Sequence, residues 1–519
     1  MGALDKPLSF LRSWVDKLKG DESIIRSIII IVVLLGLLAG IGLFGTFRTD
    51  DSFICFRYGQ NLIKYGVWNW NSSGVHEEAY TTFTYTALSI IPAALRIDPT
   101  LFFKGIGLLW MLLLLLRMYS LSKSNLGLAV GGILVFLNPY FYIHAFSGLE
   151  TPLFVYLVFE MIIRLDEDAQ EGEVKWSSGL IALLLPLTRP EGAIFSALYM
   201  ASMAAKHPKA KNLARLFFIA LLGLAYFAIR WRYFGQPLPN PYYVKVISES
   251  GKLSRFVFNL AALRYFAIPG VFCWILIKKV NWRLAAMASF AVSLFLYGPA
   301  DLMMNYAIRF NFQIMTPLFA VAVAYLALLP QVRDRRSATM LVILIAAFVS
   351  IAPADNAQIK VGLHSGVDIA SCQERIGKIL AEFKSGSNLL LCPEAGAIPY
   401  YSGWQTLDPW GLANKEVARG RTTWSALLSQ NPQVVMNYYH GDWIEAKDEM
   451  PAMLKEYDER YRAIEEHGEY SFCAAVEMTP SVNLMIFVNP KLSYAKSLTD
   501  ELRALGRERH AQLIGNKGL

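Results

Sequence analysis

The sequence predicts a polytopic α-helical membrane protein with about 11 transmembrane helices and a C-terminal α/β domain. Three observations lead to this prediction. Of the 519 residues, 55% are hydrophobic and only 17% are charged, whereas soluble domains average roughly 25% charged residues. Long apolar blocks recur through residues 1–352, and the composition becomes polar and mixed after residue 353. This pattern excludes a disordered or collagen-like chain and argues against a soluble protein.

The net charge of +8 divides unevenly between the two parts of the chain. Residues 1–352 hold 32 basic and 20 acidic side chains, whereas residues 353–519 hold 17 basic and 21 acidic ones. The basic excess therefore belongs to the apolar part, as the cytoplasmic loops of a membrane protein require. A nucleic-acid surface would instead be expected on a polar domain, so we predict no nucleic-acid partner.

The first predicted span is residues 27–47, which contain no charged side chain and are long enough to cross a bilayer core of about 30 Å. It is too long for a signal-peptide core, and no clear small-residue cleavage site follows, so we expect it to be retained. The basic residues before it place the N-terminus in the cytoplasm. They are Lys6, Arg12, Lys17, Lys19 and Arg26.

Ten further apolar blocks complete the predicted membrane domain, residues 1–352. They lie at 101–119, 126–143, 150–163, 176–188, 191–205, 216–231, 264–277, 284–299, 310–329 and 339–352. Basic clusters between them mark the cytoplasmic turns and place residues 353–519 on the outer face of a bacterial inner membrane. If the short apolar block 81–95 crossed the membrane, the basic clusters would fall on the outer side. We therefore expect a juxtamembrane or re-entrant helix there.

Residues 353–519 are predicted to form a small α/β domain. Short apolar runs at 388–392 and 483–488, bounded by polar or turn residues, favour buried strands. Residues 371–383 have apolar side chains on one face, as in an amphipathic helix. Cys372, Cys392 and Cys473 lie in this exported part, where one disulfide could form, although isolated buried cysteines are an equal alternative.

Polar and charged residues gather in the two long outer loops predicted at 48–100 and 231–263. Asp50 and Asp51 are adjacent at the mouth of the first span, where they are either a hydrated helix end or functional groups. Aromatic, amide and acidic residues follow, a composition that suits sugar binding. In the second loop, three prolines and a glycine within 232–245 argue against a regular helix. Glu150 is either stabilised by a helix dipole or part of the site.

This one-sided gathering of acids and cations suits an enzyme that transfers a group from a lipid phosphate. A carboxylate can take the proton from an acceptor hydroxyl, and cations can neutralise the phosphate that leaves. Arg309, beside a predicted span, could snorkel to the interface or bind such a phosphate. A transporter would instead bury ionisable groups at mid-membrane depth.

Seven motifs run in order through most of the chain: DDSFICFRYGQNL from Asp50, EEAYTTF from Glu77, SGLET at 147–151, TRPEG at 188–192, YFGQPLPNPYYVK at 233–245, GPADLMMNYAIRF from Gly298 and EAGAIPYYSGWQTLDPWGL at 394–412. In these motifs the sequence resembles bacterial GT-C glycosyltransferases, especially the mycobacterial terminal arabinofuranosyltransferases and their Gram-negative relatives. It departs from them at Ala79, at Thr82-Phe83 and at Pro299-Ala300. The departures at 79–83 flank the expected site and bear on the identity of the sugar or acceptor.

The resemblance implies a GT-C fold and a metal-independent, inverting transfer of a sugar, arabinofuranose in the nearest group, from a polyprenyl phosphate. It requires no cofactor beyond this lipid-linked donor. Asp51 or Asp50 would be the general base, with Asp51 favoured. The donor phosphate would be bound by Arg57, Lys245, Arg309, Tyr242 and Tyr243. The sugar or acceptor would be bound by Glu77, Glu78, Tyr80, Glu150, Asn240 and Asp301, while Trp404 and Asp408 are weaker candidates for acceptor contact.

The resemblance leaves several points open. The acceptor could be a cell-wall arabinan, a lipopolysaccharide or a surface protein, and the donor could carry another pentose or hexose. From other classes, a lipid-carrier transporter and a non-catalytic glycan-binding membrane protein remain as alternatives. We expect the chain to act as a monomer.

Overall fold

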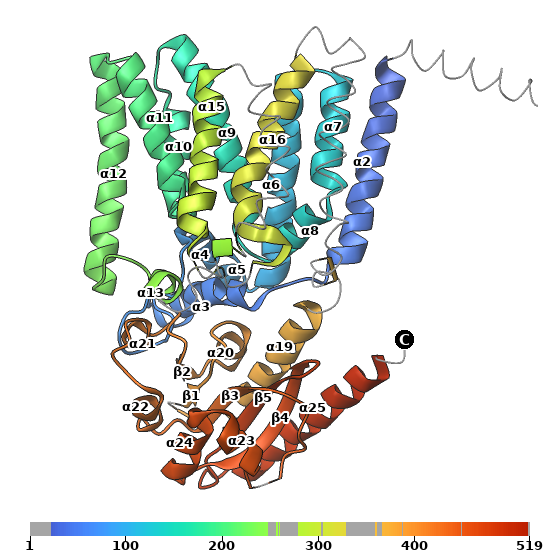
Figure 1. Ribbon diagram of the computed structural model, residues 1–519, viewed down its shortest axis with the longest axis vertical. Helices are drawn as coiled ribbons and strands as arrows, with labels where there is room; N and C mark the ends of the chain where they lie inside the picture. Colours follow the sequence, from blue (N-terminus) through green and yellow to red (C-terminus); the bar gives the residue numbers. More distant parts are fainter. Residues whose placement is uncertain are drawn as a thin grey trace, which may run out of the picture.

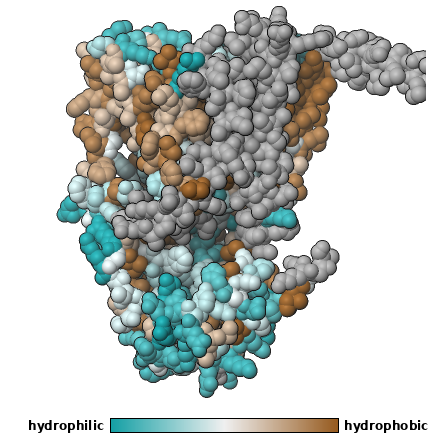
Figure 2. Space-filling model, in the orientation of Figure 1, coloured by the Kyte–Doolittle hydropathy of each residue, from teal (hydrophilic) through white to brown (hydrophobic). Residues whose placement is uncertain are grey.

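The computed structural model describes residues 22–247, 256–257, 259, 279–300, 302, 305–328, 359–360, 366–386, 388–447 and 449–516. These residues form a helical part and a smaller part built on a β-sheet, and the smaller part lies at one end of the helical part (Figure 1). Apolar side chains cover much of the visible helical surface, and hydrophilic residues cover the sheet-containing part (Figure 2). The predicted spans 264–277 and 339–352 lie outside the described residues.

The long helices of the helical part are roughly aligned with one another (Figure 1). They are α2 Glu22–Phe44, α6 Pro99–Ser122, α7 Asn125–Phe136, α9 Thr151–Glu171, α10 Trp176–Thr188, α11 Gly192–Lys206, α12 Ala210–Phe234, α15 Val280–Ala291 and α16 Arg309–Leu328. The short helix α8 Pro139–Phe146 follows α7 at an angle. Among the described residues, five segments are long and apolar enough to cross a membrane, or six if the bent pair α7–α8 forms one span. The structure thus supports a polytopic membrane protein.

The block at 126–143 was expected to form one continuous span, but the structure divides it. Helices α7 and α8 are bent by 57° relative to each other. Pro139 occupies the first turn of α8, and the Asn138 side chain accepts a hydrogen bond from the backbone N–H of Tyr140 at 3.0 Å. Because proline lacks a backbone N–H and asparagine caps well, these two residues start a new helix at this point.

Two segments that were expected to be loops contain helices. The first is α3, Asp50–Tyr65, which lies beneath the long helices (Figure 1). The short helices α4 Phe83–Leu88 and α5 Ile90–Leu95 follow it and lie in the block 81–95, where a helix was expected. The second is α13, Asn240–Ile247, where Pro241 stands in the first turn and therefore costs no hydrogen bond. The prolines of 232–245 shorten the helical stretch but do not prevent it.

The C-terminal part contains a five-stranded sheet in the order β2-β1-β3-β5-β4. Its strands are β1 Leu389–Leu391, β2 Gln405–Leu407, β3 Val434–His440, β4 Ser471–Thr479 and β5 Val482–Val488. Strand β1 pairs in parallel with β2 and β3, whereas β5 pairs antiparallel with β3 and β4. The runs predicted as strands at 388–392 and 483–488 thus correspond to β1 and β5.

Helices cover both faces of this sheet. Helices α19 Gly366–Glu382 and α25 Ala495–Asn516 pack on one face through residues such as Ile376, Leu380 and Leu502. Helices α22 Trp424–Leu428, α23 Ala452–Tyr457 and α24 Glu459–His467 cover the other face. The amphipathic helix predicted at 371–383 is confirmed as the greater part of α19.

The described cysteines are buried core residues rather than members of a disulfide. The four described cysteines, Cys55, Cys372, Cys392 and Cys473, are all buried, and none of them is joined in a disulfide. Cys372 lies on α19, whereas Cys392 and Cys473 lie at β1 and in β4. They act as small apolar side chains in the core.

Helix α3 connects the two parts of the molecule. Its Phe53 ring lies 5.4 Å, centroid to centroid, from both Tyr400 and Tyr401 of α20, Ala397–Ser402. The indole N–H of Trp70, in the loop after α3, donates to the carbonyl of Ala395 at 3.1 Å. These buried contacts fix the segment 394–404 against the first turns of α3.

Candidate functional site

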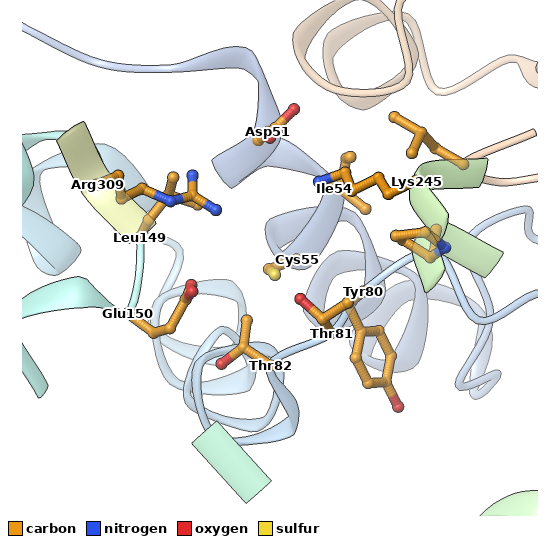
Figure 3. Close-up of a pocket in the computed structure, with 13 residues that line it drawn as sticks. Asp51, Ile54, Cys55, Tyr80, Thr81, Thr82, Leu149, Glu150, Lys245 and Arg309 are labelled. Atoms are coloured by element: carbon orange, nitrogen blue, oxygen red, sulfur yellow. The ribbon is translucent and has the colours of Figure 1, made fainter. Parts of the chain in front are cut away.

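A cavity of about 60 Å³ lies where α3, the start of α9, α13 and the start of α16 converge. Figure 3 shows Asp51 on one side of it, with Arg309 and Lys245 directed toward the centre from opposite sides and Glu150 below them. The cavity is lined by Asp51, Ile54, Cys55, Ala79, Tyr80, Thr81, Thr82, Leu149, Glu150, Pro241, Lys245, Arg309 and Leu412.

The two adjacent aspartates at the start of α3 have different surroundings. Asp51 is half-buried and lines the cavity. Asp50 is 7% exposed, does not line it, and accepts a hydrogen bond from the backbone N–H of Ala397 at 2.6 Å. Successive side chains of a helix point about 100° apart, so the two neighbouring carboxylates of α3 face different surroundings. Burial raises the pKa of Asp50 to about 6 despite this hydrogen bond.

The turn before α9 brings Glu150 to the cavity. Gly148 has a φ of 79°, and a Cβ there would lie 2.9 Å from the Cβ of Ser52 on α3. The hydroxyl of Thr49 donates to the carbonyl of Ser147 at 3.0 Å, which ties the same turn to the beginning of α3. Glycine is required here because it permits both the left-handed backbone and the close approach.

Glu150 belongs to a buried charge cluster beside the cavity. Arg189 forms ion pairs with Glu150 and, at 2.6 Å, with Glu191. Glu191 also accepts hydrogen bonds from Tyr297 and, at 3.0 Å, from Gln313. Arg189 and Glu191 belong to the same motif, TRPEG at 188–192, and Glu150 from the SGLET motif is a second partner of the same guanidinium. This cluster satisfies the Glu150 carboxylate and fixes its position at the cavity wall.

Two cations face the cavity from separate elements. Arg309, at the start of α16, is 5% exposed, and its Nε and Nη1 atoms have no hydrogen-bond partner among the described residues. Its guanidinium lies 5.0 Å from the ring centroid of Phe310. Lys245 of α13 is half-buried, and desolvation lowers the pKa of its amine, an effect that Asp51 opposes and Arg309 increases. The cavity therefore contains a buried cation with two nitrogens that have no partner among the described residues, which favours an anionic ligand.

Arg57, an expected phosphate ligand, is held away from the cavity. Its Nε donates to the carbonyl of Trp70 at 2.5 Å, and its Nη2 donates to the carbonyl of Trp404 at 2.6 Å and to Asn71 at 3.1 Å. The guanidinium also lies over the Trp70 ring, at 4.6 Å. Arg57 thus joins the loop after α3 to the C-terminal part, and we do not retain it as a phosphate ligand.

Glu77, Glu78 and Asn240 form a second buried group that does not line the cavity. Glu77 accepts from the Asn240 side-chain amide and from the backbone N–H of Lys415, both at 2.8 Å. Glu78 forms a buried ion pair with Arg230 at 2.8 Å. Burial raises the pKa of both Glu77 and Glu78 to about 7. These contacts fix α13, and with it Lys245, so the group positions the site from outside.

Of the remaining residues that the sequence predicted as ligands, one lines the cavity and the others do not. Tyr80 lines the cavity, but its ring points away from the centre (Figure 3) and its hydroxyl accepts from the Trp68 indole at 3.0 Å. Tyr242 is exposed, and Tyr243 lies under the guanidinium of Arg419, at 5.1 Å. Neither tyrosine lines the cavity, so both are poorly placed as phosphate donors in this conformation. Asp301 lies outside the described residues.

The two acceptor candidates in the C-terminal part are core residues. Trp404 is fully buried, and its indole donates to the carbonyl of Leu380 at 2.9 Å. Asp408 is also fully buried and accepts from the backbone N–H groups of Trp410 at 2.8 Å and Ala413 at 2.7 Å. These contacts support a role of both residues in the structure of the C-terminal part rather than in acceptor contact.

Sequence reasoning missed several wall residues and one half-buried acid. Cys55, Thr81 and Leu412 line the cavity but were not selected as site residues, although each lies within one of the matched motifs. Glu394 hydrogen-bonds the Asp50 carboxyl from the C-terminal part. It begins the matched motif at 394–412, which was the only sequence signal that could have identified it.

The site combines a half-buried carboxylate with two cations across a small polar cavity. A carboxylate in hydrogen-bond reach of a hydroxyl can act as a general base. An arginine and a lysine can bind and neutralise a phosphate. Within the described ranges, no group of three or more His, Cys, Asp or Glu residues is arranged to hold a metal ion.

Comparisons with known proteins support the fold. A family model described as a domain of unknown function (DUF8728) matches residues 364–483. No curated protein matches the sequence. The structure is similar to the crystal structure of ArnT from Cupriavidus metallidurans bound to undecaprenyl phosphate, with a TM-score of 0.53 and 11% sequence identity over 90% of this chain and 98% of that one. This similarity shows a shared fold.

Proposed function

We propose that this protein is a polyprenyl-phosphate-dependent glycosyltransferase of the GT-C type. The observation that carries the proposal is the cavity in which Asp51 faces Arg309 and Lys245. The shared fold with ArnT, a structure bound to undecaprenyl phosphate, supports a lipid-phosphate donor. The sequence motifs support the same class, because residues of six of the seven line one cavity.

In the proposed reaction, Asp51 takes the proton from an acceptor hydroxyl. The hydroxyl oxygen forms a bond to the anomeric carbon of the donor sugar, and the bond from that carbon to the phosphate oxygen breaks with inversion of configuration. The electron pair remains on the polyprenyl phosphate, whose charge Arg309 and Lys245 stabilise. The chemistry requires no resident metal or cofactor. Glu150, fixed by Arg189, would bind hydroxyl groups of the sugar.

We further propose arabinofuranose as the sugar and a hydroxyl of a cell-envelope glycan or surface protein as the acceptor. The support is the resemblance of the motifs to arabinofuranosyltransferases. Ala79 and Thr82, where the sequence departs from that group, both line the cavity. If the donor carries another pentose or hexose, these two positions are where the cavity wall would accommodate the different sugar.

The experiment that tests this function offers purified full-length protein a panel of polyprenyl-phosphate monosaccharides and follows release of polyprenyl phosphate. We expect release from the arabinofuranosyl donor in the presence of an acceptor. If no donor supports release, whereas vesicles containing the protein move an intact lipid carrier across the bilayer, the transporter alternative is correct. Binding of glycans without release would support the non-catalytic alternative.

The proposed reaction takes place on the outer face of a bacterial inner membrane, with a cytoplasmic N-terminus and an outer C-terminal domain, residues 353–519. His440 at the end of β3 is exposed and provides a labelling position. A cysteine introduced by His440→Cys should react with a membrane-impermeant thiol reagent in spheroplasts. Reaction only after the membrane is opened would contradict this orientation.

A further inference from the structure

Asp50 is held by a segment of the C-terminal part, although it adjoins the proposed base in sequence. Its carboxylate accepts from the Ala397 N–H at 2.6 Å, across 347 positions of sequence. Gly396 lies so close that a Cβ at that position would overlap both the carbonyl and the carboxyl of Asp50. The 394–397 segment thus leaves no room for a substrate on this side of α3.

The same carboxyl is hydrogen-bonded to Glu394, which lies in the loop after β1. Two carboxyl groups can share a hydrogen bond only if one of them carries a proton. Burial and the neighbouring Asp50 raise the pKa of Glu394 well above its ordinary value, so Glu394 holds the proton and donates it to Asp50. The Gln373 side chain also bonds Glu394 and orients it from α19.

We propose that Glu394 is a positioning residue for transfer, because its carboxyl binds Asp50 beside the Ala397 N–H, fixes the first turn of α3 and so directs Asp51 into the cavity. The inference rests on the proposed function and deepens it. The C-terminal part completes the site through this carboxyl pair, although among the described residues it supplies only Leu412 to the cavity wall.

The mechanism of this positioning follows from helix geometry. Asp50 and Asp51 are consecutive residues of one helical turn, so a rotation that frees Asp50 also turns Asp51 away from the acceptor. A misplacement of about 1 Å can reduce a catalysed rate by roughly 100-fold. Lys245 and Arg309 come from α13 and α16, so donor binding should be insensitive to the pair.

Glutamine and alanine at position 394 separate hydrogen bonding from size and charge. In Glu394→Gln the amide N–H still donates to the Asp50 carboxylate, whereas in Glu394→Ala the donor is lost. We expect Glu394→Ala to lower kcat for sugar transfer at least about tenfold, with the donor KM unchanged within about twofold. Glu394→Gln should remain within about threefold of the wild type. Glu456→Ala and Glu456→Gln, at an exposed acid of α23, are the matched controls.

Hydrogen exchange in the full-length protein provides a readout that does not depend on transfer. The Ala397 amide is protected by its bond to Asp50, so peptides that cover 394–401 should exchange faster in Glu394→Ala and unchanged in Glu394→Gln. Unchanged exchange in Glu394→Ala, or an equal loss of kcat in both variants, would overturn the inference. If the wild type transfers no sugar, the proposed function fails, and the exchange data alone decide whether the pair holds α3.

Discussion

Arg309 and Arg57 are both buried arginines that the sequence suggested as phosphate ligands. We expect replacement of Arg309 to weaken donor binding without loss of stability, and replacement of Arg57 to lower stability. In Arg309→Met the apolar stem remains beside Phe310, while a guanidinium with two unpartnered nitrogens among the described residues is removed. A charge-assisted hydrogen bond is worth about 1.5–3 kcal/mol, so the donor Kd should rise by roughly 10- to 150-fold. Because a buried charge without a partner is costly, the apparent Tm should stay the same or rise.

Arg57→Met should show the reverse. Three hydrogen bonds to Trp70, Asn71 and Trp404 are lost, each worth about 1 kcal/mol net, and the unfolding free energy should fall by roughly 2–4 kcal/mol. Donor Kd is measured by titration of a polyprenyl phosphate against intrinsic fluorescence, and Tm is measured in the same detergent. A Tm loss in Arg309→Met equal to that of Arg57→Met, with an unchanged donor Kd, would refute the assignment of Arg309.

Two further predictions concern the buried acids around α13. Glu78→Gln removes the charged partner of the buried pair with Arg230. We expect a loss of about 3 kcal/mol in the free energy of unfolding, seen as a lower apparent Tm. An unchanged Tm would show that Arg230 relies on its hydrogen bonds to the Pro237 carbonyl instead. For Glu77, burial raises the folded-state pKa from 4.5 to about 7, so its contribution to stability is largest below pH 4.5 and is lost as the pH rises to about 7. Glu77→Gln should therefore flatten the decline of Tm between pH 5 and pH 8, and a parallel decline in both proteins would contradict this.

Hydropathy predicted the helices that face lipid, because those helices are apolar over most of their surface. Helices α2, α6 and α12 correspond closely to the blocks 27–47, 101–119 and 216–231. The break between α7 and α8 was missed because both pieces are apolar, and the local signal at Asn138-Pro139 was outweighed by the hydropathy of the whole block. Helix α3 was missed because the polar side chains that it holds in the interior resemble a loop in sequence.

The sequence predicted which residues gather at the site, but it predicted only part of their arrangement. Motif matching identified Asp51, Glu150, Lys245 and Arg309, all of which line one cavity. It could not separate Asp51 from Asp50, because the rotation of α3 is fixed by contacts with residues more than 340 positions away, such as Ala397. Long-range pairs decide which charges are satisfied, and a single sequence does not show them.

The most direct test of the central claim is sugar transfer by Asp51→Asn compared with Asp442→Asn, a matched substitution at an exposed aspartate of the C-terminal part. Asparagine preserves the size of the side chain but cannot accept the acceptor proton, and general-base catalysis typically contributes about 100- to 10,000-fold. We predict that Asp51→Asn loses at least about 100-fold in kcat, with wild-type Tm and donor Kd, while Asp442→Asn transfers at the wild-type rate. Wild-type transfer by Asp51→Asn would contradict the account.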